Sequence, residues 1–449
     1  MGVALDPHLL LKSGHHVPVG ETAIRDPDMC LRHLLRSVFA LGFAALTSVC
    51  RADDGLARAQ ELFDQAAARR ADGDYAESIR LLQRIVSDQP ALGRARAELA
   101  LTQYQALNFA AARSEAEKLL ADPSLPPNVR NNLRSLLDRI DLESRTHTLQ
   151  PFVSVGLGSD SNANVGPSGD TVQVGGASLT LVPGSTRQSD TFTQVNAGVS
   201  HRYLSPRTLD LMGAGAAMIW QSSASYFTQN YRSLPRFDLD VASLATGPAV
   251  IVAGKARAGL SLQHDEIGLG HSRLAGYTGI SPNLTLTFGG TEISADAQSQ
   301  RRRFHDAANR GRDSQFVSAG LTLGRALAGG AASLQIGARW FNENASDQRF
   351  GNRGDEVFAG ATWRAWQGGQ VFGRSGLRRP SYKDVEPLFN QVRADHERRN
   401  SLGLSHSIQS GVGTGIIVTL SASFTRNRST VPIYQYERDQ ISLSASKTF

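Results

Sequence analysis

The sequence predicts an α+β multidomain protein in which tetratricopeptide-like helices precede an all-β transmembrane barrel of about 14 antiparallel strands. Two observations carry this prediction. A motif recurs at a spacing of 34 residues before position 147, and apolar and polar residues alternate after position 148. We divide the chain into residues 1–52 (an upstream extension plus a signal peptide), residues 53–147 (the helical domain) and residues 148–449 (the barrel).

The predicted signal peptide begins late in the sequence. Basic residues follow Met29, an apolar run extends from Val38 to Val49, and small residues precede the expected cleavage after Ala52. Residues 1–28 are polar and aperiodic, so we take Met29 as the true start and the upstream stretch as an artefact of start assignment. Cys50 could instead be lipidated, although the large Val49 before it fits a lipobox poorly.

Composition excludes several classes of site. The two cysteines, Cys30 and Cys50, both precede the expected cleavage point, so the mature chain would have no disulfide and no cysteine metal site. Lys and Arg number 13 against 15 Asp and Glu in residues 53–145, but 29 against 22 in residues 146–449. The basic excess therefore belongs to the barrel.

The helical domain is predicted from its repeat. Tyr75 and Phe109 are 34 residues apart, as are Ser78 and Ala112, and this spacing is the tetratricopeptide period. We expect the aromatic residue to pack between the two helices of a unit and the small residue to let them approach closely. These residues could equally be ordinary core.

Two prolines and a third amphipathic segment complete the predicted domain. Pro90 and Pro123 would end the second helix of each repeat. A further helix from Asn128 to about Arg145 would cap the stack, with Leu133, Leu136, Leu137 and Ile140 on one face. Function would then lie in the concave groove, where an extended segment of another protein could bind.

The barrel is predicted from strand alternation and from the lengths of the connections. Within 332–340, apolar side chains occupy alternate positions, although a soluble sandwich would alternate too. Outer-membrane barrels join strands by tight periplasmic turns and longer outer loops. Six short turns are expected at 205–207, 246–248, 281–283, 328–330, 367–369 and 409–411, and seven loops at 160–188, 221–231, 264–271, 300–314, 343–353, 380–397 and 427–437. They require fourteen strands, with both barrel ends and the helical domain on the periplasmic side.

The last strand carries a candidate assembly signal. Ile441, Leu443 and Phe449 share one face, and the chain stops on that Phe, as expected for the signal that the barrel assembly machinery reads. Lys447 interrupts the apolar face and weakens the match.

Charged residues at inward positions would line the lumen. The candidates are Arg202, Lys255, Arg257, Arg339 and Arg364, together with Asp210 and Glu356. A barrel of this width needs a polar lining whatever it transports, so their role can be purely structural. The runs Arg301–Arg303 and Arg398–Arg399 at loop ends either contact lipopolysaccharide phosphates or are only solvated.

No enzyme chemistry is predicted. The histidines of the mature chain lack metal-ligand spacing, so we expect no metal, no cofactor and no catalysis. His147 and His201 could still meet a Ser in space, as in an outer-membrane phospholipase, but no sequence feature favours it. Gly156-Leu157-Gly158 lies in a strand without a following helix, so it is no phosphate-binding loop, and no nucleic-acid partner is expected.

The segment Gly156-Leu157-Gly158-Ser159-Asp160-Ser161-Asn162-Ala163-Asn164 ends the first predicted strand. With the preceding repeat pair, the helix from Leu125 onward and the terminal Lys447-Thr448-Phe449, it resembles the surface lipoprotein assembly modulator (Slam) family of type XI secretion translocators. The resemblance covers residues 55–449 and implies an outer-membrane protein with its repeats in the periplasm. Its repeats would engage a client lipoprotein or secreted protein, and its fourteen-stranded barrel would provide the route.

Three functions from different classes remain open at this point. Protein translocation comes first, exopolysaccharide export by a porin with periplasmic repeats second, and a passive porin third. Exopolysaccharide exporters generally carry many repeats, and a porin would have no evident use for the helical domain. For the motif residues Asp160, Asn162 and Asn164, capping of a turn is favoured over direct contact with a client or ion.

Overall fold

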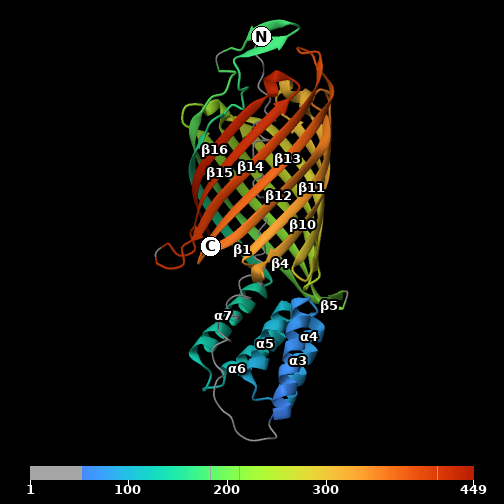
Figure 1. The fold of residues 1–449 in the computed structure, drawn as a ribbon, viewed down its shortest axis with the longest axis vertical. Helices are drawn as coiled ribbons and strands as arrows, with labels where there is room; N and C mark the ends of the chain where they lie inside the picture. Colours follow the sequence, from blue (N-terminus) through green and yellow to red (C-terminus); the bar gives the residue numbers. More distant parts are fainter. Residues whose placement is uncertain (1–52, 183, 212, 412) are drawn as a thin grey trace.

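The computed structural model describes residues 53–182, 184–211, 213–411 and 413–449. The predicted signal peptide, the predicted start at Met29 and the two cysteines lie outside the described residues. A helical domain sits beneath one end of a tall barrel, and the C-terminus lies at that same end (Figure 1).

Five α-helices are described in the first domain. They are α3 (Asp53–Ala71), α4 (Tyr75–Asp88), α5 (Gly93–Gln105), α6 (Phe109–Leu120) and α7 (Pro127–Glu143). Both α4 and α6 end before the prolines expected to stop them, and the predicted capping helix is α7. On α7, Leu133, Leu136 and Ile140 are buried against α5 and α6, and Leu137 is partly buried.

The turn from α3 to α4 has the same geometry as the turn from α5 to α6. Gly73 and Leu107, 34 residues apart, both have a left-handed backbone, with φ of 77° and 63°. The hydrogen bonds around them repeat at the same offset: Gly73 N to Arg70 O and Leu107 N to Tyr104 O (both 3.0 Å), and Asp74 N to Arg69 O and Asn108 N to Gln103 O (both 2.9 Å). The predicted period therefore corresponds to a repeated helix-turn-helix geometry.

Fourteen antiparallel strands close into a single barrel, as predicted. β1 pairs with β4 on one side and with β16 on the other, while β2 and β3 form a separate hairpin beyond the end of the barrel that is remote from the helices (Figure 1). The strands are β1 (His147–Asp160), β2 (Thr171–Val174), β3 (Ala177–Thr180), β4 (Asp190–Leu211), β5 (Ala214–Tyr231), β6 (Leu239–Val252), β7 (Ala256–Leu269), β8 (Ser272–Phe288), β9 (Thr291–Phe304), β10 (Ser314–Leu327), β11 (Ala332–Ala345), β12 (Asn352–Trp366), β13 (Gly369–Glu386), β14 (Gln391–Ser407), β15 (Ile417–Ser429) and β16 (Tyr436–Thr448).

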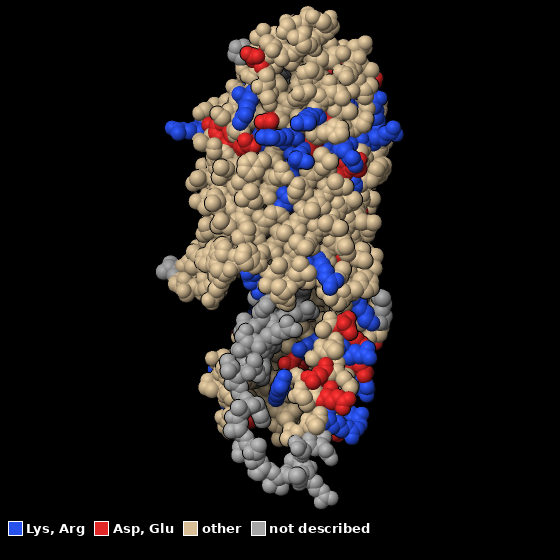
Figure 2. Space-filling view, in the orientation of Figure 1, with Lys and Arg blue, Asp and Glu red and all other residues tan. Residues whose placement is uncertain are grey.

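The barrel wall has an apolar outer face. Leu157, Leu321 and Ile336 are more than half exposed and lie on the outward parity of their strands, as the alternation predicted. Charged side chains gather near the end of the barrel remote from the helices and over the helical domain, and the wall between them is largely free of charge (Figure 2). This band is the surface that a bilayer would cover.

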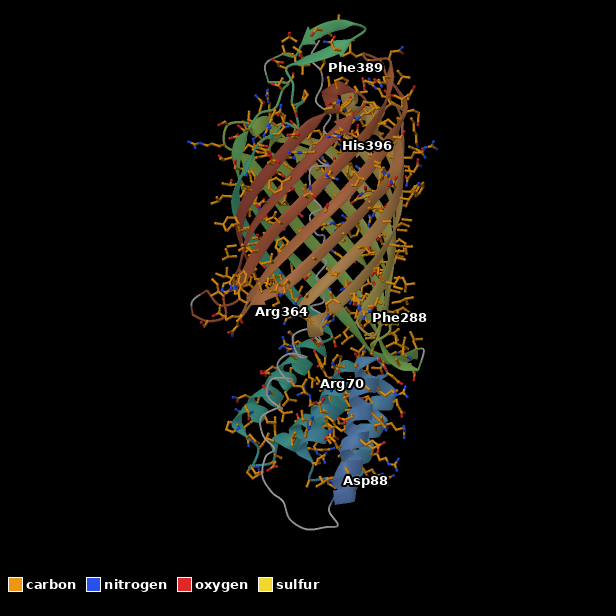
Figure 3. All side chains as sticks on the ribbon, in the orientation of Figure 1. Arg70, Asp88, Phe288, Arg364, Phe389 and His396 are labelled. Atoms are coloured by element: carbon orange, nitrogen blue, oxygen red, sulfur yellow. The ribbon has the colours of Figure 1, made fainter. Side chains whose placement is uncertain are left out.

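The short turns lie at the end that faces the helical domain. Phe288 and Arg364 lie near this end, and Phe389 and His396 near the opposite end (Figure 3). The turns expected near 328, 367 and 409 follow β10, β12 and β14, as predicted. Both ends of the barrel sequence therefore face the helices.

Three predicted turns are wrong. Residues 205–207, 246–248 and 281–283 lie inside β4, β6 and β8, and the turns fall later, near 213, 254 and 289. Each misplaced site contains a proline at an interruption of one ladder: between Leu204 and Thr208, at 247–248 and at 281–282. A proline cannot donate to a ladder. The register shifts around Pro206, as at a β-bulge, whereas at Pro248 and Pro282 the pairing with one neighbouring strand is interrupted without a change of register.

The outer loops are shorter than predicted. The segment 221–231 belongs to β5, the segments 264–271 and 380–397 are largely strand, and strands extend into both ends of 300–314 and 427–437. The strands carry polar residues in their outer parts because they continue beyond the apolar band. Polarity marked the end of the membrane-facing surface, not the end of hydrogen bonding.

Candidate functional site

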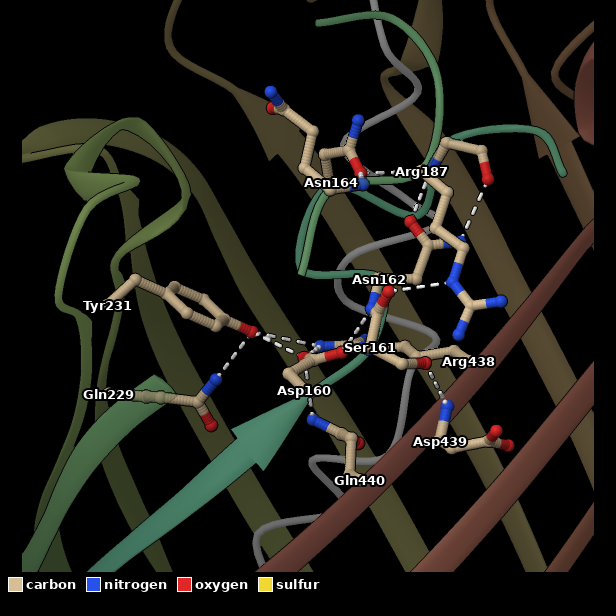
Figure 4. A network of polar contacts seen from close by, with 12 residues as sticks. Asp160, Ser161, Asn162, Asn164, Arg187, Gln229, Tyr231, Arg438, Asp439 and Gln440 are labelled. Atoms are coloured by element: carbon tan, nitrogen blue, oxygen red, sulfur yellow. Dashed lines mark hydrogen bonds and ion pairs between the residues drawn. The ribbon is translucent and has the colours of Figure 1, made fainter. Parts of the chain in front are cut away.

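Asp160 is the last residue of β1 and the centre of a buried polar network (Figure 4). Its side chain is fully buried and accepts hydrogen bonds from Arg438 (Nη2 at 2.6 Å, Nε at 3.0 Å) and from the Tyr231 hydroxyl at 2.7 Å. Gln440 Nε2 donates at 3.0 Å and the Asn162 backbone N–H at 2.9 Å. The network joins the first strand to the last, and it also reaches β5.

Asn162 and Asn164 bind backbone groups of the chain. Asn162 exchanges hydrogen bonds with Gly166 through both ends of its amide and donates to the carbonyl oxygen of Glu437 at 2.9 Å. Asn164 donates to the Thr186 carbonyl at 2.7 Å and accepts from the Gln188 N–H at 2.9 Å. These contacts are those of side chains that shape a turn.

The segment after β1 packs against the inner wall of the barrel. Ala163 and Val165 are buried in a cluster whose wall members are Phe192, Tyr231 and Tyr436, from β4, β5 and β16. Arg187 also donates from its Nε to the Ser161 carbonyl at 2.8 Å. The motif predicted at the end of strand one therefore turns the chain inward and fastens it at the outer mouth.

The inner wall carries alternating charges across neighbouring strands. Arg339 lies opposite Glu356, Glu356 opposite Arg378, and Arg378 opposite Glu397. Arg339 also donates to Asp296 at 2.7 Å, across the intervening strand β10. The ion pair between Arg339 and Asp296 passes over Gly320 of β10, where an added Cβ would lie 2.9 Å from an Asp296 oxygen.

The predicted lumen charges are placed in different surroundings. Arg339 is ion-paired on the wall as described, and Arg257 lies near the start of β7. Arg202 donates to the Glu143 carbonyl at 3.2 Å, where α7 ends, and Arg364 donates to the Gly330 carbonyl at 2.9 Å. Lys255 lies in the turn between β6 and β7, outside the wall strands.

The inner wall also carries aromatic rings, which the sequence reasoning missed. Several phenylalanines lie over a glycine of the adjacent strand, so that an added Cβ would meet the ring within 3 Å. These pairs are Phe152 with Gly198, Phe192 with Gly158, Phe341 with Gly354, Phe358 with Gly337 and Phe372 with Gly403. The rings are thereby held against the wall and do not project across the lumen.

Guanidinium groups cover two of these rings and two tyrosine rings. Arg374 lies 3.7 Å from the centroid of Phe358, and Arg378 lies 4.2 Å from that of Phe341. Arg393 lies between Tyr434 and Tyr382, at 3.6 and 4.3 Å. The inner wall therefore carries cation–π pairs as well as charge pairs.

The helical domain contains a shallow hollow of about 380 Å³ between α4, α5 and α6. Its rim is polar: Arg96 and Lys118 both donate to Glu115, at 2.7 and 2.8 Å, and Gln83 and Gln103 complete the lining.

The four predicted packing residues have distinct surroundings. Ser78 is fully buried and donates to the Ala66 carbonyl at 2.8 Å, so α3 and α4 are in close contact there. Ala112 is fully buried, and Phe109 lies tilted against Tyr104 with centroids 6.0 Å apart. Tyr75 is 6% exposed and lies in a cluster that belongs partly to the barrel.

The helical domain is in direct contact with the barrel. Tyr75 packs with Ala106 and with Ala253 of the turn between β6 and β7, and Leu107 is partly buried on the same cluster. The backbones of Gly73 and Gly254 meet so closely that an added Cβ on Gly73 would lie 2.6 Å from the Gly254 oxygen. The contact fixes the repeats beneath the turn end of the barrel.

His147 and His201 meet, although the sequence offered no reason to expect it. Their Nδ1 and Nε2 atoms are 3.0 Å apart and the rings are stacked. Neither ring hydrogen-bonds a serine in the described part of the chain, so no nucleophile and base are paired there. Among those residues, no group of three or more potential metal ligands is found, and no helix is long and apolar enough to cross a membrane.

The comparison with protein families bears on β9 to β16. Residues 291–449 match the model of the surface lipoprotein assembly modifier family. The resemblance read from the sequence is confirmed over these strands. The matched region includes Arg438 and Gln440 but not Asp160, Asn162 or Asn164. Together with the closed barrel, the match to the surface lipoprotein assembly modifiers places the chain in the outer membrane and supports a translocator role.

No curated protein matches the sequence. Among solved structures, an anion-selective porin from Comamonas acidovorans is 10% identical, covering 68% of this chain and 99% of its own, with a TM-score of 0.38. A loop L8 deletion mutant of Vibrio cholerae OmpT is 6% identical, with coverage of 68% and 100% and a TM-score of 0.39. Pseudomonas aeruginosa OccK9 is 10% identical, with coverage of 69% and 99% and a TM-score of 0.32. At these scores the likenesses carry no argument about function.

Proposed function

We propose that this chain delivers surface lipoproteins or related secreted proteins from the periplasm to the cell exterior, with the client docking on the helical repeats. The observation that carries the proposal is the junction at Tyr75, which holds the repeats under the end of the barrel that has short turns. Short turns are typical of the periplasmic side. A client bound in the hollow between α4 and α6 would therefore be held beside the barrel.

Exopolysaccharide export is the second candidate, and the inner wall bears on it. Aromatic strips and acids favour sugar passage because sugar rings stack on open aromatic faces. Here the faces of Phe341 and Phe358 are covered by Arg378 and Arg374, and both rings lie against glycines. Such faces are poorly placed for stacking on a sugar, so the protein-translocation proposal is preferred. A passive porin leaves the docked helical domain without a use.

Two partner proposals accompany this function. Ile441 and Leu443 point outward on β16, and Phe449 follows the end of that strand. All three are more than two-fifths exposed, which suits the predicted signal for the barrel assembly machinery. Of the arginine run, Arg302 pairs with Glu343 at 3.0 Å, whereas Arg301 and Arg303 are exposed. We assign the latter two to lipopolysaccharide phosphates at the outer rim.

The test compares the surface lipoproteins of Gram-negative cells that carry the gene or an empty vector. Intact cells are briefly shaved with protease, and the released lipoprotein peptides are quantified by mass spectrometry. Wild type should raise the yield from one lipoprotein or a few. Deletion of residues 55–145 should abolish that rise while the barrel still inserts; an unchanged rise would refute docking on the repeats.

A point variant makes the test specific to the hollow. Arg96→Glu/Lys118→Glu reverses the charge of its rim, and Arg134→Glu is the matched control on the exposed face of α7, away from the hollow. The first variant should lower lipoprotein display and the second should not. Equal effects would show that general charge, and not the hollow, is responsible.

A further inference from the structure

The junction between the first and last strands differs from the rest of the wall. The ladder between β1 and β16 runs from Phe152 opposite Thr448 to Asp160 opposite Gln440, and it is the shortest between any two neighbouring strands of the barrel. The strand β1 is itself longer than this ladder, since it pairs with β4 from His147 onward. Fewer directly opposed residue pairs therefore join this seam than join any other two neighbouring strands of the barrel.

The inner face of the seam has little side-chain contact to add. The inward pairs after Phe152 are Ser154 with Ser446, Gly156 with Ser444 and Gly158 with Ser442. Cross-strand side-chain pairs are the main source of sheet stability beyond the backbone, and glycine and serine contribute least to it. Bulk is also excluded at Gly158, where a Cβ would lie 2.4 Å from the Phe192 ring.

The outer end of the same seam is strongly fastened. Asp160 on β1 and Arg438 on β16 form an ion pair that is 0% and 3% exposed. Beyond it, Ser161 N donates to the Asp439 carbonyl at 2.9 Å, Asp439 N donates to Ser161 Oγ at 2.8 Å, and Asn162 donates to the Glu437 carbonyl. The motif residues thus continue the pairing with β16 after the β1 strand has ended.

We propose that the β1–β16 seam is the place where the barrel opens sideways to release its client, and that Asp160, Asn162 and Arg438 form its latch. The proposal rests on the proposed function for the identity of the cargo. A client anchored by acyl chains must leave the lumen toward the bilayer. A seam whose inner face is joined by small side chains parts with little loss of contact on the lumen side once the latch is released. The Nη1 atom of Arg438 is buried with no partner among the described residues, so the guanidinium has a donor left for a competing acceptor.

Opening of the seam would expose unpaired backbone N–H and C=O groups of β1 and β16. Backbone groups freed in hydrocarbon must be satisfied by other partners. The serines on the inner face of β16 keep that strand accessible to lumen water and to an extended client segment, which can pair with the exposed edge.

The first experiment tests opening without a client. Spin labels are attached at Val155→Cys and Ala445→Cys, the outward pair directly opposed across the seam, in vesicles of phosphatidylethanolamine and phosphatidylglycerol. The matched control pair, Val418→Cys and Ala445→Cys, spans β15 and β16 and shares one label. Combining each pair with Asp160→Asn/Arg438→Gln should reduce dipolar broadening for the seam pair and leave the control pair unchanged. Unchanged broadening at the seam would overturn the latch.

The second experiment keeps the latch intact and locks the seam. Ser154→Cys/Ser446→Cys forms a disulfide across β1 and β16, and Ser421→Cys/Ser442→Cys forms one across β15 and β16. Oxidised seam-locked cells should lose lipoprotein display to the empty-vector level and regain it on reduction, with the control unaffected. Full display from the locked barrel would overturn lateral release. If wild type itself displays no lipoprotein, the proposed function fails, while the spin-label result still decides whether the seam opens.

Discussion

Removal of either partner of the Asp160–Arg438 pair should destabilise the barrel more than removal of both. Asp160→Asn leaves a buried guanidinium without its carboxylate, and Arg438→Met leaves a buried carboxylate without its cation. Breaking a buried pair in this way costs about 3–5 kcal/mol. The two single variants would together amount to about 6–10 kcal/mol if their effects were independent.

The double variant Asp160→Asn/Arg438→Met contains no buried charge at this place. The amide oxygen that replaces the Asp160 carboxylate can still accept from the Tyr231 hydroxyl or from the Asn162 N–H, two of the donors that Asp160 has now. What remains is the loss of one or two hydrogen bonds, each worth about 1 kcal/mol net. We therefore expect a cost of about 1–2 kcal/mol for the double variant, far less than the sum of the single effects.

The measurement is denaturant unfolding of the purified barrel in lipid vesicles, followed by the gel mobility of the heat-modifiable folded form. The exposed pair of Arg379 and Asp355, 2.6 Å apart, is the control, and Arg379→Met should cost less than about 1 kcal/mol. Additive single effects, or an Arg438→Met cost as small as that of the control, would refute the claim that burial makes this pair a latch.

Three further perturbations follow from the structure. Gly320→Val should destabilise the barrel by about 1–3 kcal/mol because its side chain displaces Asp296 from its ion pair, whereas Gly324→Val on the same strand, with open space around it, should cost little in the same unfolding measurement. Tyr75→Ala should remove about 3–5 kcal/mol from the junction cluster, and faster protease cleavage between the helices and the barrel would reveal it; cleavage at the wild-type rate would contradict the docked arrangement. Deletion of Phe449 should slow assembly and lower the amount of heat-modifiable barrel, and wild-type amounts would count against the assembly signal.

The number of strands could be predicted, whereas their limits could not. Turn and loop signals alternate along the chain, and a missed boundary shifts a turn without removing a strand. Pro206, Pro248 and Pro282 look like turn residues in isolation, yet each lies inside a strand; Pro248 and Pro282 stay paired with the strand on one side while the pairing on the other side is interrupted. A strand can continue through a proline when no neighbouring strand requires a hydrogen bond from that position. Whether one does depends on how the whole sheet is paired, which no local sequence shows.

The site was predictable only on the side that carries a local motif. Asp160, Asn162 and Asn164 form a short polar run that can be noticed in the sequence, but Asp160 and Arg438 are 278 positions apart. The closing pair of a barrel has the largest sequence separation of any pair of adjacent strands, so no local pattern links its members. One signal in the sequence could have found it. Arg438 is at an inward-facing position of the last strand, and closure of a barrel with an even number of strands places the last strand beside the first.

Leu107 shows how the helical domain is adapted to the barrel. It occupies the position of Gly73 in the second repeat and has the same left-handed backbone, which costs a residue with a side chain about 1–3 kcal/mol. A glycine would avoid that cost but would lack the side chain that packs on the cluster of Tyr75 and Ala253. The turn between α3 and α4 therefore contacts the barrel through the backbone of Gly73. The turn between α5 and α6 uses the side chain of Leu107, whose backbone is strained. Because both contacts end on barrel surface, the orientation of the hollow relative to the turn end of the barrel is set by packing and does not depend on the linker.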